Sequence, residues 1–271
     1  MTQERDYVLG THDEEIERLG LQHRVWRPRA LDAWRRAGFT VGQTLVDLGC
    51  GPGYAALDLA EIVGPGGRVH ALDRSRRFLN ALDAFRAPRG LGQITPHEVD
   101  LDEAPLPVEG ADGAWARWVF AFVKQPRELL RKVHGSLRPG GVLVLHEYFD
   151  YRTWRMIPRC ADQEAVVGTV MASWRREGGE PDIALDLSRW LEELGFELRA
   201  LNPLIDVVSP RDHTWHWPIA FLRVGMKRLV DLGRLEAAQA QAVEATIEAM
   251  ERDPRARMIT PGVLEVIAVK R

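Results

Sequence analysis

A glycine-rich turn constrains what this chain can fold into more than any other feature. Residues 46–60 have the sequence VDLGCGPGYAALDLA. The apolar residues 44–49 predict a buried strand and residues 54–63 a helix, so the glycines lie where the strand ends and the helix begins. Bare backbone at such a place lets a ligand approach closely, and the first amides of the helix point toward it. The stretch therefore predicts an α/β fold that binds a ligand at this turn.

Strands and helices alternate along residues 44–149. Further strands are predicted at 68–73, 92–100, 113–123 and 142–149. A helix capped by Ser75 follows the second strand, and a helix over 125–137 follows the fourth. The fifth strand, VLVLHEYF, is almost continuously apolar, as a strand buried in a parallel sheet is. The alternation predicts a parallel sheet with right-handed crossovers and helices on both faces.

Length and composition argue against several other classes. The chain has 271 residues, 45% of them hydrophobic, and a net charge of -3, which provides no bulk positive field to hold a nucleic acid. No run of about 18 apolar residues occurs, so we expect no membrane span. The opening MTQERDYVLG lacks the apolar segment of a signal peptide. Two cysteines, Cys50 and Cys160, are too few for a disulfide framework or a zinc cluster. We expect a cytoplasmic protein, either a monomer or a homodimer.

Three kinds of ligand fit a glycine turn, and the neighbouring residues discriminate among them. A phosphate-binding P-loop needs Lys followed by Ser or Thr after the glycines, and neither pair occurs here. The dinucleotide pattern G-x-G-x-x-G/A is matched by Gly51, Gly53 and Ala56, with Asp73 at a suitable distance to bind a ribose. Asp47 argues against this ligand, because a carboxylate beside the turn repels a diphosphate. An NAD(P)-dependent Rossmann oxidoreductase therefore stays open only as an alternative.

S-adenosylmethionine fits these acids better, because it carries an ammonium group and no phosphate. Asp47 can face the ammonium, although it could instead cap the helix over 54–63. Asp73, at the end of the second strand, can accept from both ribose hydroxyls. Asp100, at the end of the third, can accept from the adenine amino group, with Asp102 of the same VDLDE segment as the alternative. Acids at successive strand ends share one edge of the sheet, which is where open α/β sheets bind ligands.

Five segments, in this order, resemble those of class I S-adenosylmethionine-dependent methyltransferases. They are VDLGCGPG, VHALDRS, HEVDLDEAPLP, DGAWARWVF and LRPGGVLVLHEY. The resemblance is to the small-molecule group called methyltransferase type 11 or 25, similar to quinone-biosynthesis methyltransferases. It is strong over residues 42–150 and moderate over 187–198 and the last strand. The segments are specific for the cofactor and not for the methyl acceptor.

The resemblance implies a Rossmann-like seven-stranded sheet. Its strand order is 3-2-1-4-5-7-6 with strand 7 antiparallel, and an N-terminal helical cap and a helical lid insertion are added to it. We expect a single methyltransferase domain over 1–271. Its parts are a helical cap at 1–40, the cofactor-binding core at 41–150, a lid at 151–186, and the rest of the core at 187–271 with a helical insertion at about 211–252.

The resemblance also implies which residues hold the cofactor. Besides Asp47, these are Gly49, Gly51 and Gly53 around the methionyl part, Asp73 at the ribose, and Asp100 with Leu101 at the adenine; Arg74, next to Asp73, is a further cofactor-binding candidate. Arg117, just after the fourth strand, matches a position that lines the sulfonium side, although it could instead be a structural ion-pair partner. Tyr7 and Gln22 are candidates for closing the cap over the cofactor.

The expected reaction is direct, in-line methyl transfer to O, N or C of a small-molecule acceptor, with S-adenosylhomocysteine as the product. An acceptor hydroxyl or acidic carbon needs a base. His146 and Glu147 leave the fifth strand at the ligand edge, and we expect only one of them to face the pocket, because adjacent strand residues point to opposite faces. His12 and Tyr148 are further candidates.

Aromatic residues are expected to wall the acceptor site, which suits a planar, apolar or cationic acceptor. The candidates are Trp118, Tyr148, Trp154 and Trp174. No metal is expected, because His213 and His216 lack a third ligand and no acid pattern of a metal-dependent enzyme follows the fourth and fifth strands. A protein that binds S-adenosylmethionine without turnover remains the other alternative.

Overall fold

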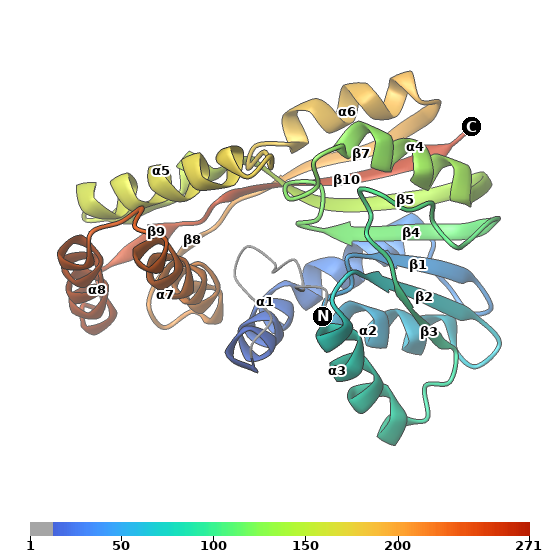
Figure 1. Ribbon diagram of the computed structural model, residues 1–271, viewed down its shortest axis with the longest axis horizontal. Helices are drawn as coiled ribbons and strands as arrows, with labels where there is room; N and C mark the ends of the chain where they lie inside the picture. Colours follow the sequence, from blue (N-terminus) through green and yellow to red (C-terminus); the bar gives the residue numbers. More distant parts are fainter. Residues whose placement is uncertain (1–12) are drawn as a thin grey trace.

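A seven-stranded sheet runs through the computed structural model, which describes residues 13–271 (Figure 1). Its order is β3-β2-β1-β4-β5-β10-β7, and β10 is antiparallel to both of its neighbours. Counted along the chain, these strands have the order 3-2-1-4-5-7-6, so the predicted topology is confirmed. The strands are β1 (Thr44–Leu48), β2 (Arg68–Asp73), β3 (Ile94–Glu98), β4 (Ala111–Arg117), β5 (Leu137–Asp150), β7 (Phe196–Leu204) and β10 (Gly262–Lys270).

Helices cover both faces of the sheet, as the alternation predicts. One face packs against α1 (Asp13–Ala37), α2 (Tyr54–Val63) and α3 (Arg76–Arg86). The other packs against α4 (Pro126–Ser136) and α6 (Ala184–Glu193). The predicted cap of α3 is present, since the Ser75 side chain accepts a hydrogen bond from the Phe78 amide. A short 3₁₀ helix, η1 (Ala87–Arg89), follows α3.

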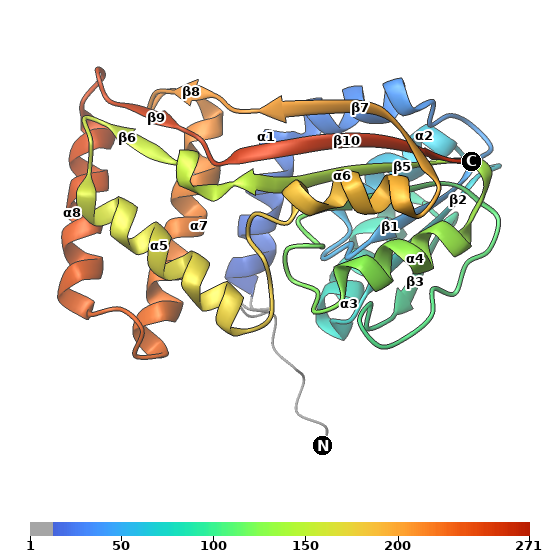
Figure 2. The same ribbon diagram turned by 90° about the horizontal axis from the view of Figure 1, so that it is seen from above.

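A lid lies beyond the carboxyl ends of the parallel strands (Figures 1 and 2). Two insertions build it, one between β5 and α6 and the other between β7 and β10, and their helices and short strands pack together around one apolar cluster. The first contains η2 (Tyr151–Thr153), β6 (Arg155–Ile157) and α5 (Ala161–Arg176); the second contains β8 (Val207–Val208), η3 (His213–Trp215), α7 (His216–Asp231), α8 (Ala237–Arg252) and β9 (Arg257–Ile259). The strands β6, β9 and β8 form a small antiparallel sheet of their own.

Two strand predictions need correction. The strand predicted over 113–123 ends at Arg117, because Trp118 takes a left-handed backbone conformation with φ of 53°. The segment after it turns back and its amides bind the Glu147 carboxylate. The strand predicted over 142–149 is longer and spans Leu137–Asp150, with an irregularity over residues 138–141, where the register with β4 shifts between Leu137 and Val142.

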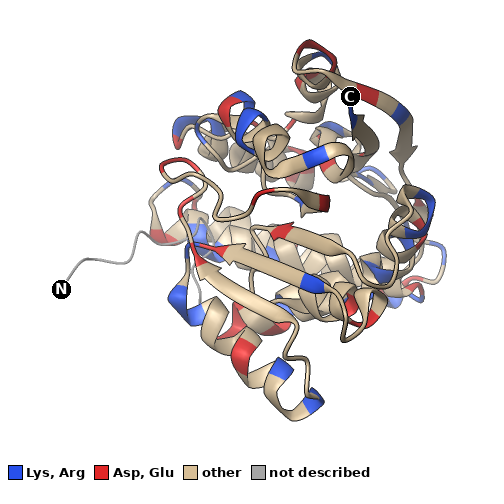
Figure 3. Cartoon of the chain, turned by 90° about the vertical axis from the view of Figure 1, so that its right-hand side faces the viewer, with Lys and Arg blue, Asp and Glu red and all other residues tan. Residues whose placement is uncertain are grey.

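In Figure 3 lysines and arginines are interspersed with acids over the elements that face the viewer. Many are paired within the chain, as Arg127 is with Glu193 and Arg223 with Glu244. Among the described residues, no helix is long and apolar enough to cross a bilayer.

Candidate functional site

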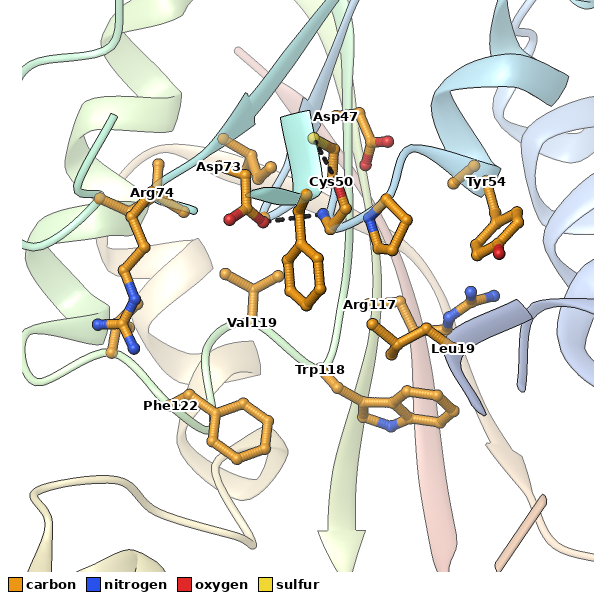
Figure 4. A pocket seen from close by; sticks show the side chains of 18 of the residues that line it. Leu19, Asp47, Cys50, Tyr54, Asp73, Arg74, Arg117, Trp118, Val119 and Phe122 are labelled. Carbon is orange, nitrogen blue, oxygen red and sulfur yellow. Dashed lines mark hydrogen bonds between the residues drawn. The ribbon is translucent and has the colours of Figure 1, made fainter. Parts of the chain in front are cut away.

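A cavity opens at the carboxyl edge of the sheet, between the glycine turn, α1 and the lid (Figure 4). Its empty space, which includes open solvent at the mouth, is about 1240 Å³. The predicted residues that line it are Gln22, Asp47, Gly49, Gly51, Asp73, Arg74, Asp100, Leu101, Arg117, Trp118, Tyr148 and Trp174. Tyr7 and His12 lie outside the described residues.

The glycine turn has a conformation that other residues would strain. Gly49 has φ of 59°, and a Cβ there would lie 2.7 Å from Val119 Cγ2. Gly53 has φ of 85°, and a Cβ there would lie 2.3 Å from Leu82 Cδ1. Gly51, between them, faces open space, with the nearest side-chain atom 3.8 Å from the site of a Cβ. The turn therefore presents bare backbone to the cavity while Gly49 and Gly53 pack tightly behind it.

Asp73 ends β2 and is oriented by backbone amides. One carboxylate oxygen accepts from the Gly51 amide at 2.8 Å, the dashed line at Asp73 in Figure 4, and the other accepts from the Ser75 amide at 2.8 Å. Burial raises the pKa of this carboxyl, and the amide hydrogen bonds oppose that effect. Because a carboxylate oxygen has two acceptor sites, each can accept a second hydrogen bond from a ligand in the cavity.

The two acids of the VDLDE segment have different surroundings. Asp102 Oδ1 accepts from the amides of Lys124 and Gln125 at 2.8 and 3.1 Å, which fixes the start of α4. Asp100 accepts from the Asp102 amide at 3.0 Å and lies half-buried against the cavity beside the buried Leu101. Asp102 also lines the cavity, but its Oδ1 is already bound to two amides of the fold, so Asp100 remains the predicted ligand-binding acid.

Asp47 is buried and only partly satisfied. It accepts a hydrogen bond from the Ala56 amide in the first turn of α2, which is the kind of contact that the capping alternative predicts. Its Oδ2 has no hydrogen-bond partner among the residues that the structure describes. Burial raises the pKa of this carboxyl to about 8, while the nearby charge of Arg117 opposes the shift. A cation in the cavity would satisfy the remaining oxygen.

Arg117 faces the cavity from the end of β4, beside Asp47 on the neighbouring strand. Its Nη2 lies 3.3 Å from Nδ1 of His23, and its Nη1 has no partner in the described part of the chain. Burial lowers the pKa of this guanidinium to about 10. The expectation that Arg117 might be a structural ion-pair partner gains no support, because no carboxylate within 13–271 forms an ion pair with it.

Sequence reasoning missed His23, which lines the cavity from α1. Its Nε2 lies 3.0 Å from Oδ2 of Asp58 on α2, and the same oxygen accepts from Arg27 Nε at 2.8 Å. A signal was available: His23 falls on the face of α1 that also carries Trp26, Ala30 and the other buried residues, where an ionisable side chain needs a partner. Gln22, a predicted residue, lines the cavity and accepts from Arg18.

Aromatic rings form the half of the cavity nearest the lid. Trp118 stacks on Tyr148 with ring centroids 5.2 Å apart. Trp174 packs edge-on against Phe122 at 4.7 Å and Phe221 at 5.7 Å. The last two rings also line the cavity and were not predicted, because nothing in their local sequence distinguishes them from core residues.

The prediction for Trp154 is wrong. This side chain is fully buried inside the lid, and its indole N–H donates to the Met258 sulfur at 3.0 Å. It does not line the cavity. The short strands β6 and β9 pair beside it, so Trp154 is part of the packing that holds the two lid insertions together.

His146 and Glu147 do not line the cavity either, although one of them was expected to face it. The His146 ring is buried against Trp26 and Trp115 and lies 3.2 Å from Glu265. Glu147 Oε1 accepts from the amides of Val119 and Phe120 at 2.7 and 2.9 Å. Both faces of β5 are covered at this point, so the alternation of side chains buries both residues.

Residues 46–145 match the model of a family described as "Methyltransferase domain". The biotin biosynthesis bifunctional protein BioHC of Teredinibacter turnerae is 34% identical over 135 residues, 46% of this chain and 24% of that protein. A demethylmenaquinone methyltransferase of Geobacillus kaustophilus is 30% identical over 126 residues, 46% of this chain and 53% of that protein. The crystal structure of a putative methyltransferase from Bacillus halodurans has a TM-score of 0.59 at 18% identity, over 89% of this chain and 97% of that one.

The family model matches the part of the fold that forms the polar half of the cavity. The chain spans about half the length, or less, of the curated relatives named above. The matched region 46–145 includes the glycine turn and the ends of the first four strands. It leaves out α1 and both lid insertions, which supply His23, Trp174 and Phe221.

Proposed function

We propose that the chain is a class I S-adenosylmethionine-dependent methyltransferase, as its similarity to the methyltransferase domain family and to quinone-biosynthesis methyltransferases supports, and that it transfers a methyl group to a small, planar and largely apolar acceptor. One observation carries the proposal: a single cavity joins a polar half, made by the glycine turn and the strand-end acids, to an aromatic half beneath the lid. Aromatic walls favour flat apolar molecules. A screen with labelled methyl donor would show whether O, N or C of the acceptor is methylated.

The polar half fits S-adenosylmethionine. The unpartnered Asp47 Oδ2 suits an ammonium group, and the bare backbone at Gly51 leaves room for the methionyl chain. Asp73, held by two amides, has acceptor sites left for the ribose hydroxyls. Asp100 and Leu101 stand at the next strand end, where an adenine would lie against them. When bound, the cofactor supplies an electrophilic methyl group.

The aromatic half of the cavity would orient the acceptor. Trp118, Tyr148 and Trp174 would hold the acceptor flat and keep water away from the reacting atoms, which aligns the displacement. If the acceptor must lose a proton, Tyr148 is the predicted base candidate that lines the cavity. His146 and Glu147 could act only after a rearrangement that exposes them.

Calorimetry tests the cofactor first. We expect S-adenosylhomocysteine to bind and NADH not to bind. Replacing Asp73 with Ala removes the two ribose acceptors and should weaken S-adenosylhomocysteine about tenfold or more, because hydrogen bonds to a charged group contribute ~1.5–3 kcal/mol. Asp83→Ala, an exposed change on the outer part of α3, is the matched control and should leave the affinity unaltered.

A screen with labelled methyl donor then tests the reaction. Planar phenols, quinols and aryl amines are the acceptors of choice, and demethylmenaquinone is included because one relative is named for it. Transfer of label to such a compound supports the proposal. Binding of NADH in place of S-adenosylhomocysteine would overturn it, and cofactor binding without transfer to any acceptor would leave a binding protein.

A further inference from the structure

Four polar side chains form a hydrogen-bonded series from the surface of α1 to the cavity. Arg27 donates to Asp58, Asp58 lies against His23, and His23 lies against Arg117. We call Arg27, Asp58 and His23 the His23 relay. His23 is buried, whereas the Arg27 side chain is 45% exposed, so the relay extends from solvent to the floor of the cavity. It joins α1 and α2 to the end of β4.

The hydrogen bonds of the relay determine which ring nitrogen of His23 carries the proton. Burial would raise the pKa of Asp58, but hydrogen bonds from His23 and Arg27 hold it below its ordinary value. Burial, assisted by the charge of Arg117, lowers the pKa of His23, while Asp58 opposes the shift. A neutral ring beside a charged carboxylate carries its proton on Nε2. Nδ1 is therefore left as an acceptor, and it faces Nη2 of Arg117.

At the end of the relay, an acidic and a basic side chain face the cavity without pairing. Asp47 is in register with Trp115 across β1 and β4, and Arg117 lies two residues further along the same face. Among the described residues, Asp47 Oδ2 and Arg117 Nη1 each lack a hydrogen-bond partner. A buried carboxylate and a buried guanidinium that stand close but unpaired complement a ligand that carries both charges itself. The α-amino acid end of a molecule has that arrangement.

We propose that Arg117, held in place by the His23 relay, binds the carboxylate of the methionine end of the cofactor while Asp47 binds its ammonium. This inference rests on the proposed function. Arg117 is the residue that contacts the ligand, and His23 and Asp58 are positioning residues that act through it. The guanidinium presents Nη1 to the carboxylate because Nη2 is already committed to His23.

Two ligands that differ in one group test the inference. S-adenosylhomocysteine carries the carboxylate, and its decarboxylated analogue keeps the ammonium, thioether and adenosine. For Arg117→Met we expect S-adenosylhomocysteine to bind about 10–100-fold more weakly, the effect of losing a hydrogen bond to a charged group, with the analogue changed by less than about threefold. Arg117→Lys keeps the charge without the planar fork and should give an intermediate loss.

The role of the relay is tested by the ratio of the affinity for S-adenosylhomocysteine to the affinity for its decarboxylated analogue. His23→Phe removes the acceptor that holds Nη2 and should weaken S-adenosylhomocysteine selectively. His23→Asn puts an oxygen near the position of Nδ1 and should restore part of the loss. A purely structural disturbance would weaken both ligands together, so the ratio separates positioning from folding. Arg74→Met is the matched control, because Figure 4 shows Arg74 and Arg117 at opposite ends of the cavity, and it should affect both ligands equally.

Each outcome has a distinct consequence. If the unmodified protein binds neither ligand, the proposed function fails. If it binds both and Arg117→Met lowers both affinities alike, or neither, the cofactor site stands and this inference is overturned. If Arg117→Met misfolds, Arg117→Lys and His23→Asn decide by the same ratio, and an unchanged ratio in both overturns it.

Discussion

Asp47 shows how one residue can serve both the fold and a ligand. One of its bonds goes to the Ala56 amide of α2, and the other oxygen is left without a partner in residues 13–271. The sequence argument used this acid to disfavour a diphosphate. The structure adds that burial raises its pKa to about 8, so the carboxyl is mostly protonated at pH 7 until a cation arrives.

Ligand binding at pH 7 should therefore release a proton. An ammonium beside Asp47 favours the ionised carboxylate and lowers its pKa, so up to about one proton leaves per S-adenosylhomocysteine bound. Calorimetry in phosphate and Tris, whose ionisation enthalpies differ, measures this number. Asp47→Asn should release none. A binding enthalpy independent of buffer in the unmodified protein contradicts the prediction.

The residues found from sequence and those missed differ in a physical way. Asp73 and Asp100 were predictable because strand ends place them on one edge of the sheet. His23, Phe122 and Phe221 could not be assigned to the cavity, because their positions depend on how α1 and the lid dock on the core. Trp154 was predicted wrongly for the same reason, since an aromatic ring of the lid can face the cavity or the lid's own interior.

At the scale of elements, Glu265 on β10 connects its two neighbouring strands, β5 and β7, with helix α1. Its carboxylate accepts from Asn202 on β7 at 2.8 Å and from Arg36 on α1 at 2.5 Å, and it lies 3.2 Å from His146 on β5. Burial would raise its pKa, but these hydrogen bonds hold it at about 2. His146, expected to act as a base, is therefore part of the network that anchors α1 to the sheet.

Removing this charge should make the protein less stable in a pH-dependent way. A carboxyl whose pKa is lower when folded contributes stability that is present above pH ~4.5 and is lost as the pH falls toward 2. Glu265→Gln should lower the free energy of unfolding by about 2 kcal/mol at pH 7 and by clearly less at pH 3. Urea unfolding at the two pH values measures the difference, and Glu197→Gln, an exposed change on β7, serves as control. An equal loss at both pH values would refute the assignment.

Other element boundaries show where sequence patterns stop being informative. The helix over 54–63 and the strand over 68–73 were predicted at their observed bounds, because apolar periodicity and glycine punctuation agree there. The strand predicted over 113–123 extends six residues past the end of β4, since Val119–Val123 is as apolar as a strand. The strands β6, β8 and β9 have only two or three residues each, which is too short for any period to be visible.

Across the whole molecule, Trp118 connects the core, the cap and the lid. It stacks on Tyr148 of β5 and on Trp217 of α7, with centroids 5.2 and 5.3 Å apart, and it meets Trp26 of α1 edge-on at 5.2 Å. These contacts hold it in a left-handed conformation that a non-glycine residue rarely adopts. The sequence could not predict this meeting, because the three partners are far apart along the chain.

Trp217→Ala tests whether the lid supports the acceptor half separately from the cofactor half. Trp217 is buried against Trp118 and Trp26 but does not line the cavity. Its truncation should lower the free energy of unfolding by about 3–5 kcal/mol, as other large-to-small core changes do. Because Trp118 then loses one stacking partner, the KM for an acceptor found in the screen should rise severalfold.

The affinity for S-adenosylhomocysteine should change little in Trp217→Ala, since the glycine turn, Asp73 and Asp100 belong to the core sheet. Urea unfolding, steady-state kinetics and calorimetry measure the three quantities on one variant. Trp190→Ala, a partly buried change on α6, is the control and should reduce stability without raising that KM. If the affinity for S-adenosylhomocysteine falls as much as acceptor binding does, the two halves of the cavity form one cooperative unit. That result would contradict the prediction that the core and the lid support the two halves separately.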